Sequence, residues 1–436
     1  MIENIMPLMM FVVLFGFLLL GVPIAFSLSL TGVLFSYFIW GARGFNLITS
    51  AAWGTMNNFT LIAIPLFVFM AVVLEKAGVV SDLYDTFYKW SGPVRGGLAV
   101  ATILVGAIIG AVSGVVAAGV VGLGLIALPE MLKYKYQTRI SLGSVMAGGT
   151  LGQLIPPSLN MVVYGAVTGT SVGKLFAGGI VAGLLLAGLF SAYILIRAYL
   201  NPELCPALPL ESRATWKEKF VSLKNVFLPS ILILFVLGSI LSGAATPTEG
   251  AAVGAFGAIL YSIVTGRLKW DLLKQASYDT VRVTTMVGWV IIGASFFSGV
   301  FSGIGGNKLI MNIAMSLPGG KWAVLAMAIL FILFLGMFLE TVAMIMLAAP
   351  IVSPILVTLG FDPLWWGLVF MTLLQVAFIS PPFGFALFYL KGVTPKNIPI
   401  EEIYWSSMPF MGLQLLGVIL IIAFPKLVLW LPGLMG

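Results

Sequence analysis

Two carboxylates stand apart from the other acidic residues of the chain. Nearly all of the 15 Asp and Glu residues lie in short polar stretches, whereas Glu340 and Glu249 fall inside or beside apolar segments. A charge in such a segment is costly and predicts a functional role. Glu340 precedes Thr341, and their oxygen atoms form a ligand set that suits a hard cation such as sodium. Glu249 instead predicts a helix cap made with Thr246 or Thr248.

Glycine and proline interrupt four apolar segments of the chain. The interruptions are Gly110–Gly114, Ile155–Asn160, Gly336–Thr341 and Ser380–Gly384. In hydrocarbon, a helix break survives only where it is buried in protein or lines a watery cavity. A double proline should split a crossing into two half-helices, whose carbonyl ends bind cations and whose N–H ends bind anions. Such residues can also merely kink a packed helix, but the matched pairs of breaks favour a binding site.

These breaks predict two related cation sites beside one solute site. The sodium ligands are expected at Ser113, Gly114 and Pro156 in one site and at Gly336, Glu340, Thr341, Ser380 and Pro381 in the other. The solute is expected at Gly110, Pro157, Ser158, Asn160, Pro382 and Gly384. The two cation sites should differ in character, because Glu340 has no acidic counterpart near Ser113. No Lys or Arg falls in the predicted pockets, so an anionic solute would rest on half-helix N-termini, hydroxyls, amides and bound cations.

Several other kinds of chemistry find no support in the sequence. The chain has no histidine, a single cysteine, Cys205, and no GxxxxGK[ST] loop for ATP. With one well-placed acid we can assemble no catalytic constellation, so we expect no catalytic residues and no metal other than sodium. The stripes of Met, Phe and Leu are typical of packing or lipid contact, and we expect no organic cofactor. The net charge of +7 is explained by its placement along the chain and does not indicate nucleic acid.

The elements that would position these residues are membrane helices. Of the 436 residues, 60% are hydrophobic and 8% are charged, whereas a soluble domain carries about 25% charged residues. Apolar runs long enough to cross a lipid bilayer recur from end to end, separated by short charged loops. The composition therefore predicts an all-α polytopic membrane protein.

The sequence also indicates an internal duplication. Prolines coincide when the chain is shifted by about 225 residues, so that Pro129 matches Pro354 and the two double prolines match each other. We expect a first repeat at residues 1–200, a cytoplasmic linker at 201–225 and a second repeat at 226–436. The expected helices cover 4–20, 22–40, 57–77, 95–130, 140–165 and 174–198, then 227–242, 246–265, 283–303, 321–354, 365–390 and 407–430. Short amphipathic stretches at 45–53, 83–90, 270–278 and 398–405 predict helices lying at the membrane surface.

Segments 95–130 and 321–354 are expected to be re-entrant hairpins. A continuous helix over 95–130 would be about 54 Å long, well beyond a hydrocarbon core of about 30 Å. Each repeat then has five crossings, including a split helix at 140–165 or 365–390, plus one hairpin. An odd number of crossings inverts the second repeat relative to the first.

Loop charges give the predicted topology an orientation. Of the 22 Lys and Arg residues, only Arg43, Lys174, Lys308, Lys321 and Lys426 fall on the side of the membrane that holds the N-terminus. The positive-inside rule makes the opposite side the cytoplasm. Both termini should therefore be periplasmic in a bacterial inner membrane.

Five segments of the chain, which overlap three of the four predicted helix breaks, resemble the large membrane subunit of tripartite ATP-independent periplasmic (TRAP) transporters. The segments that carry the resemblance lie in both repeats. They are Gly148–Ser158, Val163–Gly169, Ala245–Glu249, Gly336–Thr341 and Ser380–Gly384. One residue departs from the family pattern, because Glu340 stands where Asp is expected.

The resemblance implies an elevator-type secondary transporter, in which a domain containing both hairpins carries substrate and sodium past a fixed scaffold. It implies import of an organic acid such as a carboxylate or a sialic acid, with the sialic acid branch as the nearest match. It also implies two partners, a soluble periplasmic binding protein and a small four-helix membrane subunit, expected as a separate chain. A stand-alone ion-coupled carboxylate carrier of a related hairpin fold is the alternative, and an intramembrane enzyme or structural subunit is a third.

Overall fold

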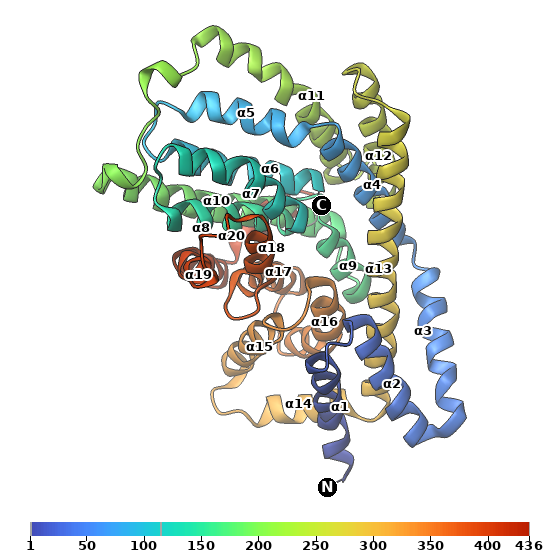
Figure 1. The fold of residues 1–436 in the computed structure, drawn as a ribbon. Helices are drawn as coiled ribbons and strands as arrows, with labels where there is room; N and C mark the ends of the chain where they lie inside the picture. The colour runs from blue at the N-terminus through green and yellow to red at the C-terminus, as the bar shows by residue number, and fades with distance from the viewer. Residues whose placement is uncertain (1, 114–115, 436) are drawn as a thin grey trace.

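A computed structural model describes residues 2–113 and 116–435 of the chain. Its regular elements within these ranges are all helices, with no β-strand (Figure 1). Eight helical stretches of the described chain are long and apolar enough to cross a membrane. The predicted all-α membrane fold is therefore confirmed.

The first half contains ten α-helices and three short 3-10 turns in the described residues. They are α1 (Ile2–Leu19), α2 (Ile24–Trp40), η1 (Gly41–Phe45), α3 (Asn46–Met56), η2 (Phe59–Ile62), α4 (Ala63–Lys76), α5 (Val79–Ser91), α6 (Gly97–Ser113), α7 (Val116–Lys133), α8 (Thr138–Thr150), η3 (Leu151–Gln153), α9 (Leu159–Thr168) and α10 (Val172–Leu200).

The second half begins with two further short 3-10 turns, η4 (Pro202–Leu204) and η5 (Leu210–Ser212). They are followed by α11 (Trp216–Leu241), α12 (Pro247–Val264), α13 (Trp270–Gly303), α14 (Gly306–Ser316), α15 (Gly320–Gly336), α16 (Thr341–Thr358), α17 (Pro363–Ile379), α18 (Phe385–Val393), α19 (Ile400–Ala423) and α20 (Lys426–Gly433).

The helix order of α1–α10 recurs in α11–α19. Helices α3 and α4 correspond to the single α13, the pair α6–α7 to α15–α16, and the pair α8–α9 to α17–α18. Packing between the halves is reciprocal, since α2 packs on α13 while α12 packs on α4, and α9 packs on α16 while α18 packs on α7. This exchange is the pattern expected of two repeats related by a pseudo-twofold axis. The inversion of the repeats across a membrane stays a prediction.

Three of the four predicted chain breaks appear in the described residues. Helix α15 ends at Gly336 and α16 begins at Thr341, while α17 ends at Ile379 and α18 begins at Phe385. The first split crossing stops at η3 and resumes at α9. The break predicted at Gly110–Gly114 does not begin at Gly110, because α6 continues to Ser113, and the end of that segment lies outside the described residues.

Two of the four predicted surface helices are wrong as separate elements. Residues 270–278 belong to the continuous helix α13, and most of 398–405 belongs to α19. In the first half, by contrast, Asn57 and Asn58 separate α3 from α4, and the Asn58 side chain accepts a hydrogen bond from the N–H of Thr60. The corresponding second-half stretch around Val281 has no Asn, Gly or Pro to end the helix. The helices at 45–53 and 83–90 are present as parts of α3 and α5.

Other helix boundaries also differ from the prediction. Helix α11 begins at Trp216, inside the expected linker, because Thr215 and Glu218 form a reciprocal capping box. A capping box between Thr246 and Glu249 starts α12, which confirms the structural interpretation of Glu249. The amphipathic helix α14 was not predicted. The last expected helix, 407–430, is interrupted after Ala423, where α19 ends before α20.

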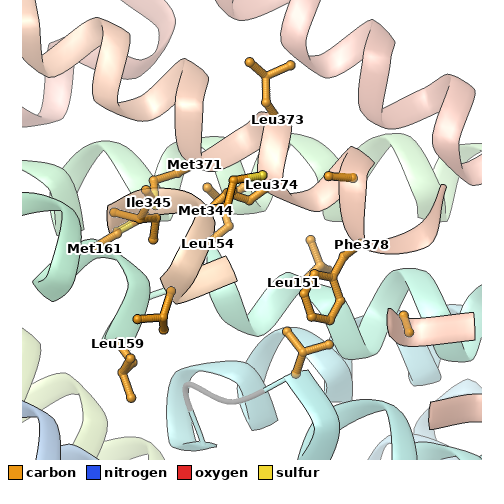
Figure 2. Close-up of a cluster of buried hydrophobic side chains, with 14 of the residues drawn as sticks. Leu151, Leu154, Leu159, Met161, Met344, Ile345, Met371, Leu373, Leu374 and Phe378 are labelled. Carbon is orange, nitrogen blue, oxygen red and sulfur yellow. The ribbon is translucent and has the colours of Figure 1, made fainter. Parts of the chain in front are cut away.

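The long helix α13 stands beside α2, α3, α4 and α16 along one side of the molecule (Figure 1). The two split crossings and the second hairpin meet beside it in an apolar core. Figure 2 shows buried side chains of this core, including Leu154, Met161, Met344, Met371 and Phe378. Apolar packing therefore surrounds the chain breaks and restricts their polar groups to a small region.

Candidate functional site

Glu340 lies at the tip of the second hairpin, where it caps the N-terminus of α16. One carboxylate oxygen accepts a hydrogen bond from the N–H of Val342 at 3.0 Å, and the other accepts from the Thr341 hydroxyl at 2.9 Å. A carboxylate is stabilised at a helix N-terminus by the unpaired N–H groups and the helix dipole. The helix therefore fixes the position of a partly buried negative charge.

A chain of polar groups connects this tip to the split crossing of the first repeat. The Thr341 Oγ1 lies 3.3 Å from Asn160 Oδ1, and the amide of Asn160 donates to Gln153 Oε1 at 3.3 Å. The Ser158 hydroxyl donates to the backbone carbonyl of Gln153. Because Thr341, Asn160, Gln153 and Ser158 are all buried, the two repeats share one polar network in an apolar core.

Three oxygen atoms of this network lie close together. The Thr341 hydroxyl has a single proton, yet its oxygen lies within hydrogen-bond distance of both Glu340 Oε1 and Asn160 Oδ1. Only one of these acceptors can receive the proton. The oxygens of Glu340, Thr341 and Asn160 therefore form the kind of donor set that a hard cation prefers.

A cavity of about 210 Å³ opens beside these oxygens. It is lined by Val116, Ala117, Leu159, Asn160, Val283, Met286, Val287, Glu340, Thr341, Val342, Phe378 and Tyr389. These side chains come from both repeats, and none of this described lining is basic. The cavity can therefore hold a small polar species beside a carboxylate, with no lysine or arginine to neutralise that charge.

Each hairpin packs closely on the broken crossing of its own repeat. A Cβ on Gly110 would lie 2.0 Å from the Cα of Gly152, and a Cβ on Gly336 would lie 2.2 Å from the Cβ of Ala377. Real Cβ atoms do not approach this closely, so glycine is required for both contacts. The structure thus brings both predicted hairpins against the predicted breaks.

The remaining predicted residues occupy the ends of half-helices. Ser158 caps α9 and Gly384 precedes α18, while Ser380 follows α17 as its C-cap and donates to the carbonyl of Ala377 at 2.9 Å. Four prolines form the turns between half-helices, and they are Pro156, Pro157, Pro381 and Pro382. Ser113 is the last residue of α6. Gly114 lies outside the described residues.

Sequence reasoning missed Gln153, whose amide links Asn160 to the break. Its Nε2 atom is buried and has no hydrogen-bond partner in the described chain. A polar residue inside an apolar crossing was the available signal. Phe378 and Tyr389 were also missed as lining residues, and aromatic side chains in apolar segments give no such signal. No cluster of three His, Cys, Asp or Glu side chains occurs in the described chain.

Comparison with known proteins gives this architecture a family. Residues 11–427 match the family described as "Tripartite ATP-independent periplasmic transporter, DctM component". The C4-dicarboxylate TRAP transporter large permease protein DctM of Pseudomonas aeruginosa is 33% identical over 94% of both chains. The sialic acid TRAP transporter large permease protein SiaM of Vibrio cholerae is 29% identical over 96% of both. The ectoine/5-hydroxyectoine TRAP transporter large permease protein UehC of Ruegeria pomeroyi is 31% identical, over 97% of this chain and 98% of its own.

A solved structure supports the fold. The YdaH transporter of Alcanivorax borkumensis superimposes with a TM-score of 0.60 at 16% identity, over 89% of this chain and 90% of that chain. The resemblance predicted from the sequence motifs is confirmed by the family match, and the relatives are transporter permeases rather than enzymes. The chain therefore belongs to the DctM-component family of tripartite ATP-independent periplasmic transporters, as a multi-pass TRAP transporter large permease subunit.

Proposed function

We propose that this large permease imports an organic acid anion, a sialic acid or a carboxylate, in symport with sodium ions. A soluble periplasmic binding protein delivers the solute, and a small four-helix membrane subunit completes the complex in the bacterial inner membrane. The termini face the periplasm. A domain that contains both hairpins moves as an elevator past a scaffold.

The observation that carries the sodium proposal is the convergence of Glu340, Thr341 and Asn160 oxygens at a cavity between the repeats. A sodium ion there would be coordinated by these three oxygen atoms. Gly336, Ser380 and Pro381 belong to the same proposed site through the packing of the hairpin on the second break.

The corresponding site in the first repeat has no carboxylate. We assign it to Ser113, Gly114 and Pro156, where backbone carbonyls and a hydroxyl would be the ligands. A neutral ligand set attracts a cation less strongly than one with a carboxylate. The two sodium sites should therefore differ in affinity.

The solute is proposed to lie against Ser158 and Asn160, near Gly110 and the turns that contain Pro157, Pro382 and Gly384. The relatives named above transport C4-dicarboxylates, a sialic acid and ectoines by name, and each of these solute classes carries a carboxylate. With no basic lining residue in the described cavity, such an anion would be held by half-helix N–H groups, amides and bound sodium.

The packing supports an elevator division of the chain. The helix pairs α2 with α13 and α4 with α12 form one reciprocal group, and the hairpins with the split crossings form another. The cavity beside Glu340 is lined by both groups, because α13 contributes Val283, Met286 and Val287. When the hairpins and split crossings slide past the other helices, a solute at this boundary changes from exposure to one side of the membrane to exposure to the other.

Uptake into proteoliposomes tests the proposal. The permease is reconstituted with the small subunit, and uptake of a C4-dicarboxylate, a sialic acid and ectoine is measured with the binding protein outside. We expect uptake of one of these solutes only with an inward sodium gradient. Uptake that persists when choline replaces sodium would refute sodium coupling. Uptake that persists when the small subunit and the binding protein are both left out would favour the stand-alone carrier.

A further inference from the structure

A second cavity, of about 330 Å³, lies between α3, α13, α16 and the end of α9. It is lined by Ser50, Ala51, Gly54, Thr55, Asn58, Leu61, Ala166, Val167, Ile291, Ser295, Ser298, Met346 and Pro350. Five of these residues carry a hydroxyl or an amide, and none of this described lining is charged. The volume falls within the range of about 300–1,000 Å³ that is typical of small-molecule sites.

The same three helices line both cavities. Helix α9 contributes Asn160 to the Glu340 cavity and Ala166 to the second one. Helix α16 contributes Val342 to the first and Met346 to the second, which is one helical turn later. Helix α13 contributes Val287 and, one turn on, Ile291. The cavities therefore follow one another along a single interface.

Buried apolar residues lie between the two sets of lining residues along α9 and α16. Met161 on α9 and Ile345 on α16 lie between the lining residues of the two cavities in their helices, and both are fully buried. Both side chains belong to the buried cluster in Figure 2. The lining residues of the two cavities are about one helical turn apart on α13 and α16, so the cavities are adjacent along the interface.

Loop charges place the second cavity on the outer side. Its lining comes from α3, η2, the end of α9, the second half of α13 and α16. The neighbouring elements along the chain carry Arg43 in η1, Lys174 in α10 and Lys308 in α14. These basic residues are among the few on the predicted periplasmic side, whereas Arg282 precedes the Glu340 cavity on the other. The second cavity therefore faces the side from which a binding protein would release its solute.

We propose that this cavity is a second, outer-side binding site for the transported solute. The inference rests on the proposed transport function and adds a site that the ion-binding residues do not include. The ligand is an organic acid that also carries hydroxyl or amide groups. These neutral groups, rather than its carboxylate, contact the protein there.

The polar side chains of the cavity can make such contacts. Ser50 and Ser295 have no hydrogen-bond partner in the described parts of the chain, so their hydroxyls are available to a solute. The Ser298 hydroxyl makes only a long contact, 3.5 Å, with the Met346 carbonyl. Without a charge the site should bind weakly and release readily, which suits a solute in transit to the Glu340 cavity.

Site-directed labelling tests the occupancy of the cavity. The sole native thiol, Cys205, is buried, and its burial raises the pKa of that thiol to about 12, so it should not react. Ser298→Cys in the complete complex is labelled with a membrane-impermeant maleimide, with and without a C4-dicarboxylate, a sialic acid or ectoine. A solute at ten times its Kd should slow labelling about tenfold.

The matched control is Ser242→Cys, an exposed position between α11 and α12 on the same predicted side. Its labelling should not respond to solute. Labelling at Ser298→Cys that none of the three solutes slows, or that slows equally at Ser242→Cys, would overturn the proposal.

Filling the cavity gives an independent test. A Cβ on Gly54 meets no atom within 4 Å, so Gly54→Leu should occupy the cavity without a clash. We expect KM for uptake to rise about tenfold while the sodium dependence stays unchanged. Gly238→Leu is the control, because that glycine is equally open but lies on α11 away from both cavities. An unchanged KM in Gly54→Leu would refute the outer site. Loss of sodium dependence in the unmodified complex would instead refute the proposed function.

Discussion

The substitution Glu340→Gln tests the ion site most directly, because it removes the charge and retains the helix cap. A glutamine carbonyl can still accept the hydrogen bond from the Val342 N–H, which the carboxylate accepts at 3.0 Å. The glutamine NH2 group takes the place of the other carboxylate oxygen and can donate to the Thr341 hydroxyl oxygen, which lies 2.9 Å from that position. The fold of the hairpin tip should therefore survive.

The expected loss follows from the position of the charge. A sodium ion in contact with Glu340 would be within about 4 Å of the carboxylate, where the attraction is about 4 kcal/mol at an effective dielectric constant of about 20. That energy corresponds to about a thousandfold in binding constant. Ion hydration and the remaining oxygens offset part of it, so we expect sodium affinity to fall between about tenfold and about a thousandfold.

Thermal unfolding of the purified complex measures this loss without transport. Sodium at 100 times its Kd stabilises the folded state of a protein that binds it by about 2.7 kcal/mol. The wild type should gain thermal stability as sodium replaces choline at constant ionic strength, and Glu340→Gln should not. Glu249→Gln is the control, since its carboxylate belongs to an exposed capping box. An identical sodium midpoint in Glu340→Gln and the wild type would remove Glu340 from the ion site.

Two further substitutions test the packing that positions the site. Gly110→Ala places a Cβ 2.0 Å from the Cα of Gly152, so we expect a cost of about 1–3 kcal/mol, measured as a lower midpoint of thermal unfolding. Gly188→Ala, where a Cβ meets nothing within 4 Å, should leave the midpoint unchanged, and equal effects would contradict the reasoning. Ser353→Ala removes the oxygen that accepts from the Trp366 indole at 3.1 Å, so a buried donor is left unpaired. We expect about 1–3 kcal/mol of destabilisation, and Ser353→Thr, which keeps the hydroxyl, should recover part of it.

Much of the fold follows from local sequence rules. A double proline removes two adjacent backbone donors from a helix, so the breaks around Pro156 and Pro381 could be predicted from residue types alone, whereas the single prolines Pro129 and Pro354 lie inside α7 and α16. The capping role of Glu249 follows from its spacing from Thr246. The shared spacing of the prolines also indicated the duplication before any packing was known.

Helix continuity was harder to predict than helix breaks. The amphipathic stretch 270–278 and the apolar stretch 283–303 were predicted as two separate helices. The structure instead has one helix, α13, that continues without interruption from Trp270 to Gly303. Whether such a stretch bends away depends on a local cap such as Asn58 in the first half. Amphipathic character alone does not supply that break.

The sequence by itself determined which groups could act as ligands, because carboxylates are rare in the apolar segments of this chain and the helix breaks follow from glycine and proline. Only the tertiary structure decided which of them meet. It joins Thr341 of one repeat to Asn160 of the other, recruits Gln153 to the same network, and aligns two cavities along α9, α13 and α16. These contacts depend on the packing of segments far apart in the chain, and helix packing in a membrane depends on side-chain shape at close range. Residue type and spacing along one chain do not encode that information locally.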